Sequence, residues 1–193
     1  AGACGEALEL LAETRATGRW TPTDAYFEGE CRERVGDPAA AVAAFEEAVA
    51  LDDRHAASWY RLARLGDEWG APEVSARARA ALWTLEPGPM LVALADARRA
   101  VLHAEPDADA RLFELTPGPG ADRRFAAEVA LLESRRWLEL GWPERAVDHA
   151  IRAAGLRPSD AEASELLARA YVAAGEPELA AGARARPRLQ LGR

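Results

Sequence analysis

Residues 38–65 read PAAAVAAFEEAVALDDRHAASWYRLARL. Two segments with helical periodicity flank the short polar link DDRH. Small side chains recur along both segments, at Ala41, Ala48 and Ala63. Small side chains let two helices approach closely, and the larger rings of Phe45 and Trp59 fill the space between neighbouring pairs. The stretch therefore predicts a hairpin of two packed α-helices.

The same pattern returns at a fixed spacing along the chain. Gly36 and Gly141 are each followed by small and apolar residues at offsets of five, nine, twelve and fifteen. The step from Gly36 to Gly70 equals the step from Gly141 to Gly175, and the gap from Gly70 to Gly141 is close to two such steps. This self-similarity predicts a repeat protein, in which helix pairs stack because no single pair can bury its apolar face.

The repeat resembles the tetratricopeptide repeat (TPR) family, whose unit is a pair of antiparallel helices of about 34 residues, the same length as the step between these glycines. Three residues of one unit fall on the family's W-x-x-L-G positions: Trp59, Leu62 and Ala63. Gly29 supplies the small residue of the first repeat, and residues 87–126 fit the pattern poorly. The resemblance implies an all-α fold, a right-handed superhelix of antiparallel helix pairs. Such a TPR-like α-solenoid would have about four recognisable repeats here.

These repeats predict one TPR-like solenoid over residues 1–183, with an irregular middle unit at about 88–122 and a basic tail at 184–193. Turn residues cut the chain into helices, which we expect at residues 5–18, 23–35, 38–51, 55–69, 72–85, 90–104, 123–140, 143–156, 159–173 and 177–183. Residues 105–122 contain three prolines and two glycines, so only a short helix at about 108–115 fits there.

The composition limits the class of protein. Hydrophobic residues make up 49% of the 193 residues and charged residues 29%, so the chain can form a packed core. The abundant alanine favours helices. The net charge is −8, and an acidic chain is not drawn to nucleic-acid phosphates or anionic lipids, so we expect no nucleic-acid partner. No run of 18 apolar residues occurs, so we predict no membrane span.

Two cysteines, Cys4 and Cys31, are too few for a disulfide framework. They would pair if the first two helices pack together, and free thiols are the alternative. The start AGAC resembles the end of a bacterial lipoprotein signal with Cys4 as the lipid-bearing residue, although three residues precede that cysteine. A cytoplasmic and an exported location both stay open.

The sequence shows no arrangement of residues that is typical of catalysis. His55, His103 and His149 stand far apart, and none has a partner at a metal-ligand spacing. The phosphate-binding lysine motif is excluded because all 24 basic residues are arginine. We therefore expect no enzymatic activity, no cofactor and no metal.

Six tryptophans are present, and they divide by position. Trp59, Trp83 and Trp137 fall on helical stripes, so we expect them in the core. Trp142 directly follows a turn glycine and is the best candidate for an exposed ring, of the kind that anchors interfaces, and packing of this ring in the core is the alternative.

The resemblance also implies a binding surface, because the first helices of successive TPR repeats line a concave face. The positions expected to face a ligand carry two tyrosines and four arginines: Tyr26, Tyr60, Arg61, Arg64, Arg135 and Arg169. Guanidinium groups pair well with carboxylates, so the predicted partner is a protein or peptide with an acidic or C-terminal segment. Arginines paired with a glutamate on their own helix, as Arg135 with Glu139, would explain the pattern equally well.

The predicted function is a non-catalytic scaffold that holds a partner protein through this face or assembles a larger complex. Two alternatives stay open. The chain would be a structural subunit packed permanently in a complex, or an accessory repeat domain of a larger enzyme.

Overall fold

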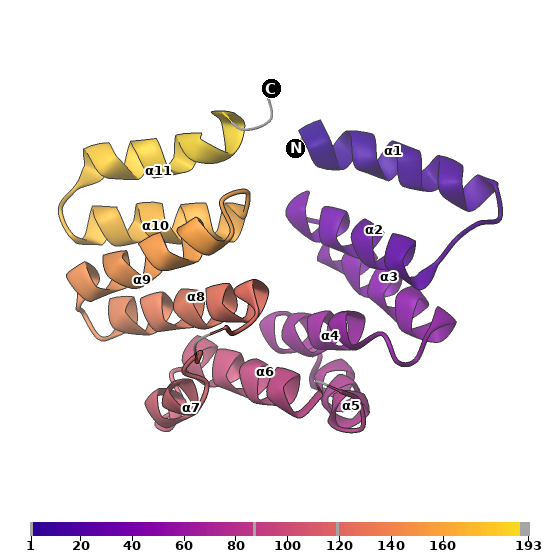
Figure 1. Cartoon of the computed structure of the whole chain (residues 1–193), viewed down its shortest axis with the longest axis horizontal. Coiled ribbons are helices and arrows are strands. Elements are labelled where there is room, and N and C mark those ends of the chain that lie inside the picture. Colours follow the sequence, from indigo (N-terminus) through magenta and orange to yellow (C-terminus); the bar gives the residue numbers. More distant parts are fainter. Residues whose placement is uncertain (1, 87, 119, 190–193) are drawn as a thin grey trace. The chain divides into compact units, whose positions relative to one another are not determined.

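A computed structural model describes residues 2–86, 88–118 and 120–189, which form α-helices and no strand. The helices follow one another along the chain as drawn in Figure 1: α1 (Gly2–Ala16), α2 (Pro22–Arg34), α3 (Pro38–Leu51), α4 (Ala56–Glu68), α5 (Pro72–Trp83), α6 (Gly88–Leu102), α7 (Ala108–Glu114), α8 (Arg123–Glu139), α9 (Pro143–Leu156), α10 (Ala161–Ala173) and α11 (Pro177–Leu189). The predicted all-α class is confirmed. None of the helices in the described ranges is long and apolar enough to cross a membrane.

The chain divides into two compact units, residues 1–99 and residues 100–193. Within the first unit, α2 packs on α3 and α4 packs on α5. Within the second, α8 packs on α9 and α10 packs on α11. Each unit is thus a series of helix hairpins, as the TPR resemblance predicts. One continuous solenoid over residues 1–183 stays a prediction.

The turns inside the helix pairs explain the glycine spacing. Four turn glycines have positive φ angles, between 69° and 83°: Gly36, Gly70, Gly141 and Gly175. Glycine adopts this left-handed conformation without the steric cost of a Cβ atom. A proline follows two residues after each of these glycines and begins the next helix, as Pro38 begins α3. The turn therefore ends one helix and starts its partner with the same two residues each time.

The middle of the chain keeps this turn with one substitution. Ala104 has a φ of 51°, stands as far after Gly70 as Gly70 stands after Gly36, and precedes Pro106 by two residues. The first helix of the middle unit, α6, has 15 residues, whereas its second helix, α7, has only 7. The irregularity expected over residues 88–122 therefore lies in α7 and in the link to α8, and the turn at Ala104 is in register with the repeats.

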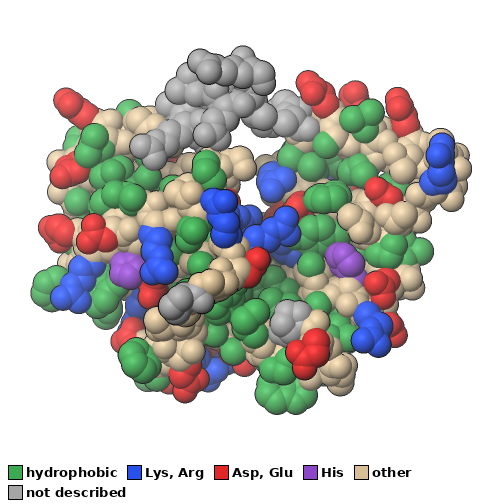
Figure 2. Space-filling model, in the orientation of Figure 1, with side chains coloured by type: hydrophobic (Ala, Val, Ile, Leu, Met, Phe, Trp, Pro, Cys, Tyr) green, Lys and Arg blue, Asp and Glu red, His purple; other side chains and the backbone are tan. Residues whose placement is uncertain are grey.

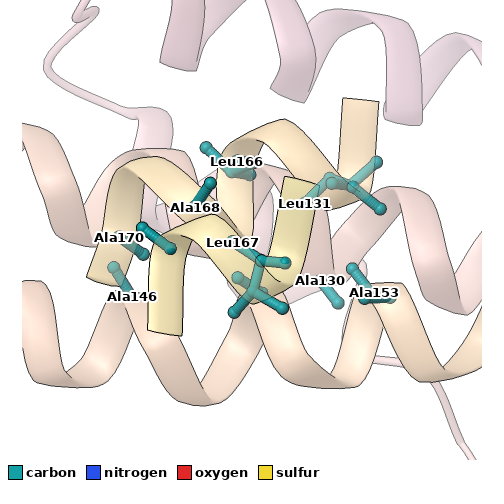
Figure 3. Packing of buried hydrophobic residues seen from close by; sticks show 13 residues of the cluster. Ala130, Leu131, Ala146, Ala153, Leu166, Leu167, Ala168 and Ala170 are labelled. Atoms are coloured by element: carbon teal, nitrogen blue, oxygen red, sulfur yellow. The ribbon is translucent and has the colours of Figure 1, made fainter. Parts of the chain in front are cut away.

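Small residues form the contacts between helices. Ala41, Ala146 and Ala180 are all buried, with exposed fractions of at most 1%. In the second unit, alanines from α9 pack against leucines and alanines of α8 and α10 (Figure 3). In the first unit, Gly29 of α2 lies against the ring of Phe45 on α3, where a Cβ atom would come within 2.5 Å of that ring. The opening stretch was therefore interpreted correctly: its alanines mark the places where helices touch.

Some expectations need correction. Trp83 was expected in the core, but it is 65% exposed, at the last residue of α5. Trp142, the candidate for an exposed ring, is 56% exposed. Helix α11 continues to Leu189, so much of the segment assigned to a basic tail is helical, and residues 190–193 lie outside the described part of the chain.

Both cysteines are free thiols, which confirms one of the two alternatives. Cys31 on α2 is buried, and Cys4 on α1 is partly buried. Burial, together with a hydrogen bond to Cys4 and the negative charge that the Cys4 thiolate would carry, raises the pKa of Cys31 to about 11. Helices α1 and α2 do pack together, and the two thiols are neighbours without a bond between them.

Candidate protein-interaction site

The six residues predicted to face a partner are on first helices, in two groups. Tyr26 lies on α2, and Tyr60, Arg61 and Arg64 lie on α4, all in the first unit. Arg135 on α8 and Arg169 on α10 lie in the second unit. The two groups have different surroundings and are considered separately.

In the first unit, Arg61 forms an ion pair with Glu30, and Tyr26 donates a hydrogen bond to the same carboxylate. Arg61 donates to Glu30 Oε1 at 2.5 Å, and the Tyr26 hydroxyl donates to the same oxygen at 3.1 Å. Burial raises the pKa of Glu30, but the charges of Arg61 and Arg34 and the hydrogen bonds from Tyr26 and Arg61 outweigh it, so the pKa lies below its ordinary value. Glu30 is therefore held ionised as part of the packing between α2 and α4.

Arg64 is more deeply buried than Arg61 and is also paired with a carboxylate. Its side chain is only 2% exposed, and it pairs with Glu33 of α2. Arg61 also reaches Glu33, at 3.4 Å. An acidic partner would have to displace these carboxylates from their arginines. Contact of Arg61, Arg64, Tyr26 and the buried Tyr60 with a partner stays a prediction, and the geometry gives the two arginines a role in joining successive repeats.

This pairing is part of a ladder of ion pairs between successive repeats. Acidic residues of one repeat pair with arginines 30 or 31 residues later, on the equivalent helix of the next repeat. The pairs are Glu30–Arg61, Glu46–Arg77 and Glu68–Arg98. The signal was an acidic residue followed by arginine about one repeat further on. Figure 2 shows that acidic and basic side chains both occur over the face in view.

The second unit contains a cavity of about 330 Å³ beside the first helices of successive repeats. Its walls come from the end of α6, from α8 and from α10: Val101, Leu102, Arg135, Leu138, Glu139 and Arg169. The structure thus brings Arg135 and Arg169 to one site, as the repeat pattern predicts. Aliphatic side chains form the rest of the wall, apart from Glu139.

The two arginines of the cavity differ in how far they are already paired. Arg135 donates from Nη2 to Glu162 Oε1 at 2.6 Å, so its ion pair is with α10 and not with Glu139 of its own helix. Its Nε is buried and has no hydrogen-bond acceptor among the described residues. Arg169 is exposed and makes no hydrogen bond or ion pair with any residue in the described ranges. At least one guanidinium is therefore open to a ligand.

The acidic residue nearest to Arg169 in sequence is already bound. Glu165 lies one helical turn before Arg169, and Arg184 of α11 donates to both of its carboxylate oxygens at 3.0 Å. The hydrogen bond from Arg184 lowers the pKa of Glu165, and the charges of Arg184 and Arg169 act in the same direction. Arg169 thus lies within the electrostatic reach of Glu165 without forming an ion pair with it.

The cavity combines hydrogen-bond donors of positive charge with an aliphatic wall. A carboxylate suits the planar fork of a guanidinium, and an apolar side chain suits Leu102 and Leu138. The described residues contain no group of three or more histidine, cysteine, aspartate or glutamate side chains that could hold a metal ion.

Comparison with known proteins shows no family for this chain. No model of a protein family matches the chain, and no curated protein matches it. One similar solved structure, that of a mutant of MamA, is 19% identical, with a TM-score of 0.42, over 86% of this chain and 95% of that one. So distant a likeness carries no argument about the fold or the function of this chain. The helix pairs and their repeated turns are what show a TPR-like fold.

Proposed function

We propose that this protein is a non-catalytic interaction scaffold that binds a segment of a partner protein at the cavity lined by Arg135 and Arg169. The observation that carries the proposal is the convergence of these two arginines, from successive repeats, on one cavity with an aliphatic wall. Repeat folds of this kind present extended surfaces to partners and are stabilised by neighbour contacts alone. The chain's acidic net charge of −8 makes a nucleic acid an unsuitable partner.

The partner segment is acidic, with an apolar side chain beside its carboxylate. The guanidinium of Arg169 is free to pair with that carboxylate. The apolar side chain packs against Leu102 and Leu138. A side-chain carboxylate and a C-terminal carboxylate offer the same chemistry here.

The second candidate function is that of a structural subunit packed permanently in a larger complex. Large apolar side chains exposed on the surface favour it. Phe113 is 81% exposed, Trp83 65% and Trp69 64%. Exposed rings of this size anchor interfaces in other complexes. Sedimentation of the isolated chain separates the two: a stable monomer supports the reversible scaffold, and concentration-dependent aggregation supports the subunit.

Fluorescence polarisation with two labelled probe peptides tests the proposed site. One peptide alternates leucine and glutamate over eight residues, and the other alternates leucine and glutamine. The glutamate peptide should bind more tightly, and Arg169→Gln should weaken its binding by roughly tenfold, or about 1.4 kcal/mol. Arg152 is an exposed arginine on α9 outside the cavity, so Arg152→Gln is a control with the same charge change. Equal binding of both peptides, or equal effects of the two variants, would remove the proposal.

A further inference from the structure

We infer that Arg184 on α11 is a positioning residue that keeps Arg169 available to the ligand by holding Glu165. This inference rests on the proposed function of the cavity. Arg184 itself is not among the residues that line it. Its effect is indirect, because it occupies the carboxylate that would otherwise neutralise Arg169.

The positions of Glu165 and Arg169 make them natural partners. They are four residues apart on α10, with the acidic residue nearer the N-terminus of the helix. This spacing and this order give the more favourable of the two possible glutamate–cation pairs on a helix surface. In the absence of another cation, Glu165 would therefore be expected to turn toward Arg169.

Arg184 prevents that pairing by its geometry. Its Nε and Nη2 each donate to a different oxygen of Glu165, both at 3.0 Å, which is the two-pronged arrangement that guanidinium and carboxylate prefer. Both carboxylate oxygens are thereby engaged on the side of α11. Arg169, although close enough for its charge to act on Glu165, has no bond to it.

The core fixes the helix that carries Arg184. Ala180 and Ala183 of α11 are buried against the cluster formed by α8, α9 and α10, with exposed fractions of 1% and 3%. Arg184 follows Ala183 directly, so the packing of α11 fixes its position relative to Glu165 on α10. The pair itself remains about half exposed, with side-chain values of 50% and 53%, so solvent screens it and its strength is moderate.

Arg184 and Arg169 therefore compete for the carboxylate of Glu165. The positive charge available in the cavity depends on which of the two arginines pairs with it. With Arg184 in place, Arg169 is free for the acidic segment of a partner. Without it, Glu165 pairs with Arg169, and a ligand carboxylate must displace Glu165 first. A purely structural role for Arg184 would affect stability but would not depend on Glu165 in this way.

A set of variants tests this dependence with the leucine–glutamate peptide. Arg184→Gln should weaken binding by about two- to fivefold, the range expected for an exposed ion pair. Adding Glu165→Gln should restore the affinity, and in an Arg169→Gln background Arg184→Gln should have no effect. Arg152→Gln again controls for net charge. If Arg184→Gln weakens binding equally with or without Glu165, the inference is overturned.

Titration of the Glu165 carboxyl by NMR tests the same exchange without any ligand. In Arg184→Gln its pKa should stay below the ordinary value, because Arg169 takes over as its partner, and only the double variant with Arg169→Gln should return it to that value. A return in the single variant would overturn the inference. Weakening by Arg169→Gln without any effect of Arg184→Gln would overturn it while leaving the proposed function intact, whereas no effect of Arg169→Gln would remove both.

Discussion

The close contact between Gly29 and Phe45 makes a sharp test of how the first helix pair packs. A Cβ atom on Gly29 would lie 2.5 Å from Cε1 of Phe45 and 2.7 Å from Cδ1 and Cζ. Carbon atoms in contact ordinarily stand about 3.5–4.0 Å apart, so the ring would have to move by about 1 Å. Phe45 is completely buried and packs on Tyr26, with ring centroids 5.7 Å apart, so it has little room to move.

Two opposing terms set the size of the effect of Gly29→Ala. Replacing glycine by alanine inside a helix favours folding by about 1 kcal/mol. Forcing an extra methyl group into a well-packed core costs about 1–3 kcal/mol. The steric term wins, and the substitution should lower the free energy of unfolding by about 1 kcal/mol. In a Phe45→Leu background the contact is gone, so Gly29→Ala should become stabilising.

Urea denaturation followed by circular dichroism, with hydrogen exchange of the α2 and α3 amides, measures this change. Hydrogen exchange is needed because a repeat protein can open locally without unfolding as a whole. Gly5→Ala is the matched control: Gly5 lies in α1, and no atom comes within 4 Å of the place an alanine methyl would take, so this change should only stabilise, by about 0.5–1 kcal/mol. If Gly29→Ala stabilises as much as Gly5→Ala, the packing described for α2 and α3 is wrong.

Two further predictions concern the turn at Ala104 and the loss of folding stability at acid pH. Ala104 holds a left-handed conformation, so Ala104→Gly should relieve its strain and raise the free energy of unfolding by up to about 1 kcal/mol in urea titrations; a clear loss would show that the turn is not strained. The pKa of Glu30 is lowered on folding, so its ionised form contributes stability above its unfolded value near 4.5, and that contribution is lost as the pH falls through the lower folded value. Glu30→Gln should therefore flatten the decline in stability below about pH 4.5, as measured by urea midpoints at successive pH values, and an unchanged slope would show that Glu30 is not held ionised.

The sequence predicts the helices and most of the turns between them. Helices α3 and α9 have their predicted bounds, residues 38–51 and 143–156, because proline fixes each start and the apolar stripe defines each length. The turn at Ala104 escaped notice because alanine rarely adopts a positive φ. Its spacing from Gly70, equal to the spacing between Gly36 and Gly70, was the available signal.

The candidate site could be predicted only in part. The repeat register placed Arg135 and Arg169 on first helices, and the structure brings them to one cavity. The sequence could not show which arginines form ion pairs, because such pairs depend on how far apart the side chains of neighbouring helices lie. Arg64 is buried and paired with Glu33. Arg169 is unpaired among the described residues because Arg184, on the next helix, binds the carboxylate of Glu165.

Titration of the ¹⁵N-labelled protein with the leucine–glutamate peptide is the most direct test of the proposed binding site. Amide shifts should concentrate at the end of α6, along α8 around Arg135 and Leu138, and on α10 around Arg169, and the leucine–glutamine peptide should cause far smaller shifts. Shifts spread evenly over both units, or shifts of equal size with the two peptides, would contradict a carboxylate-binding site at this cavity.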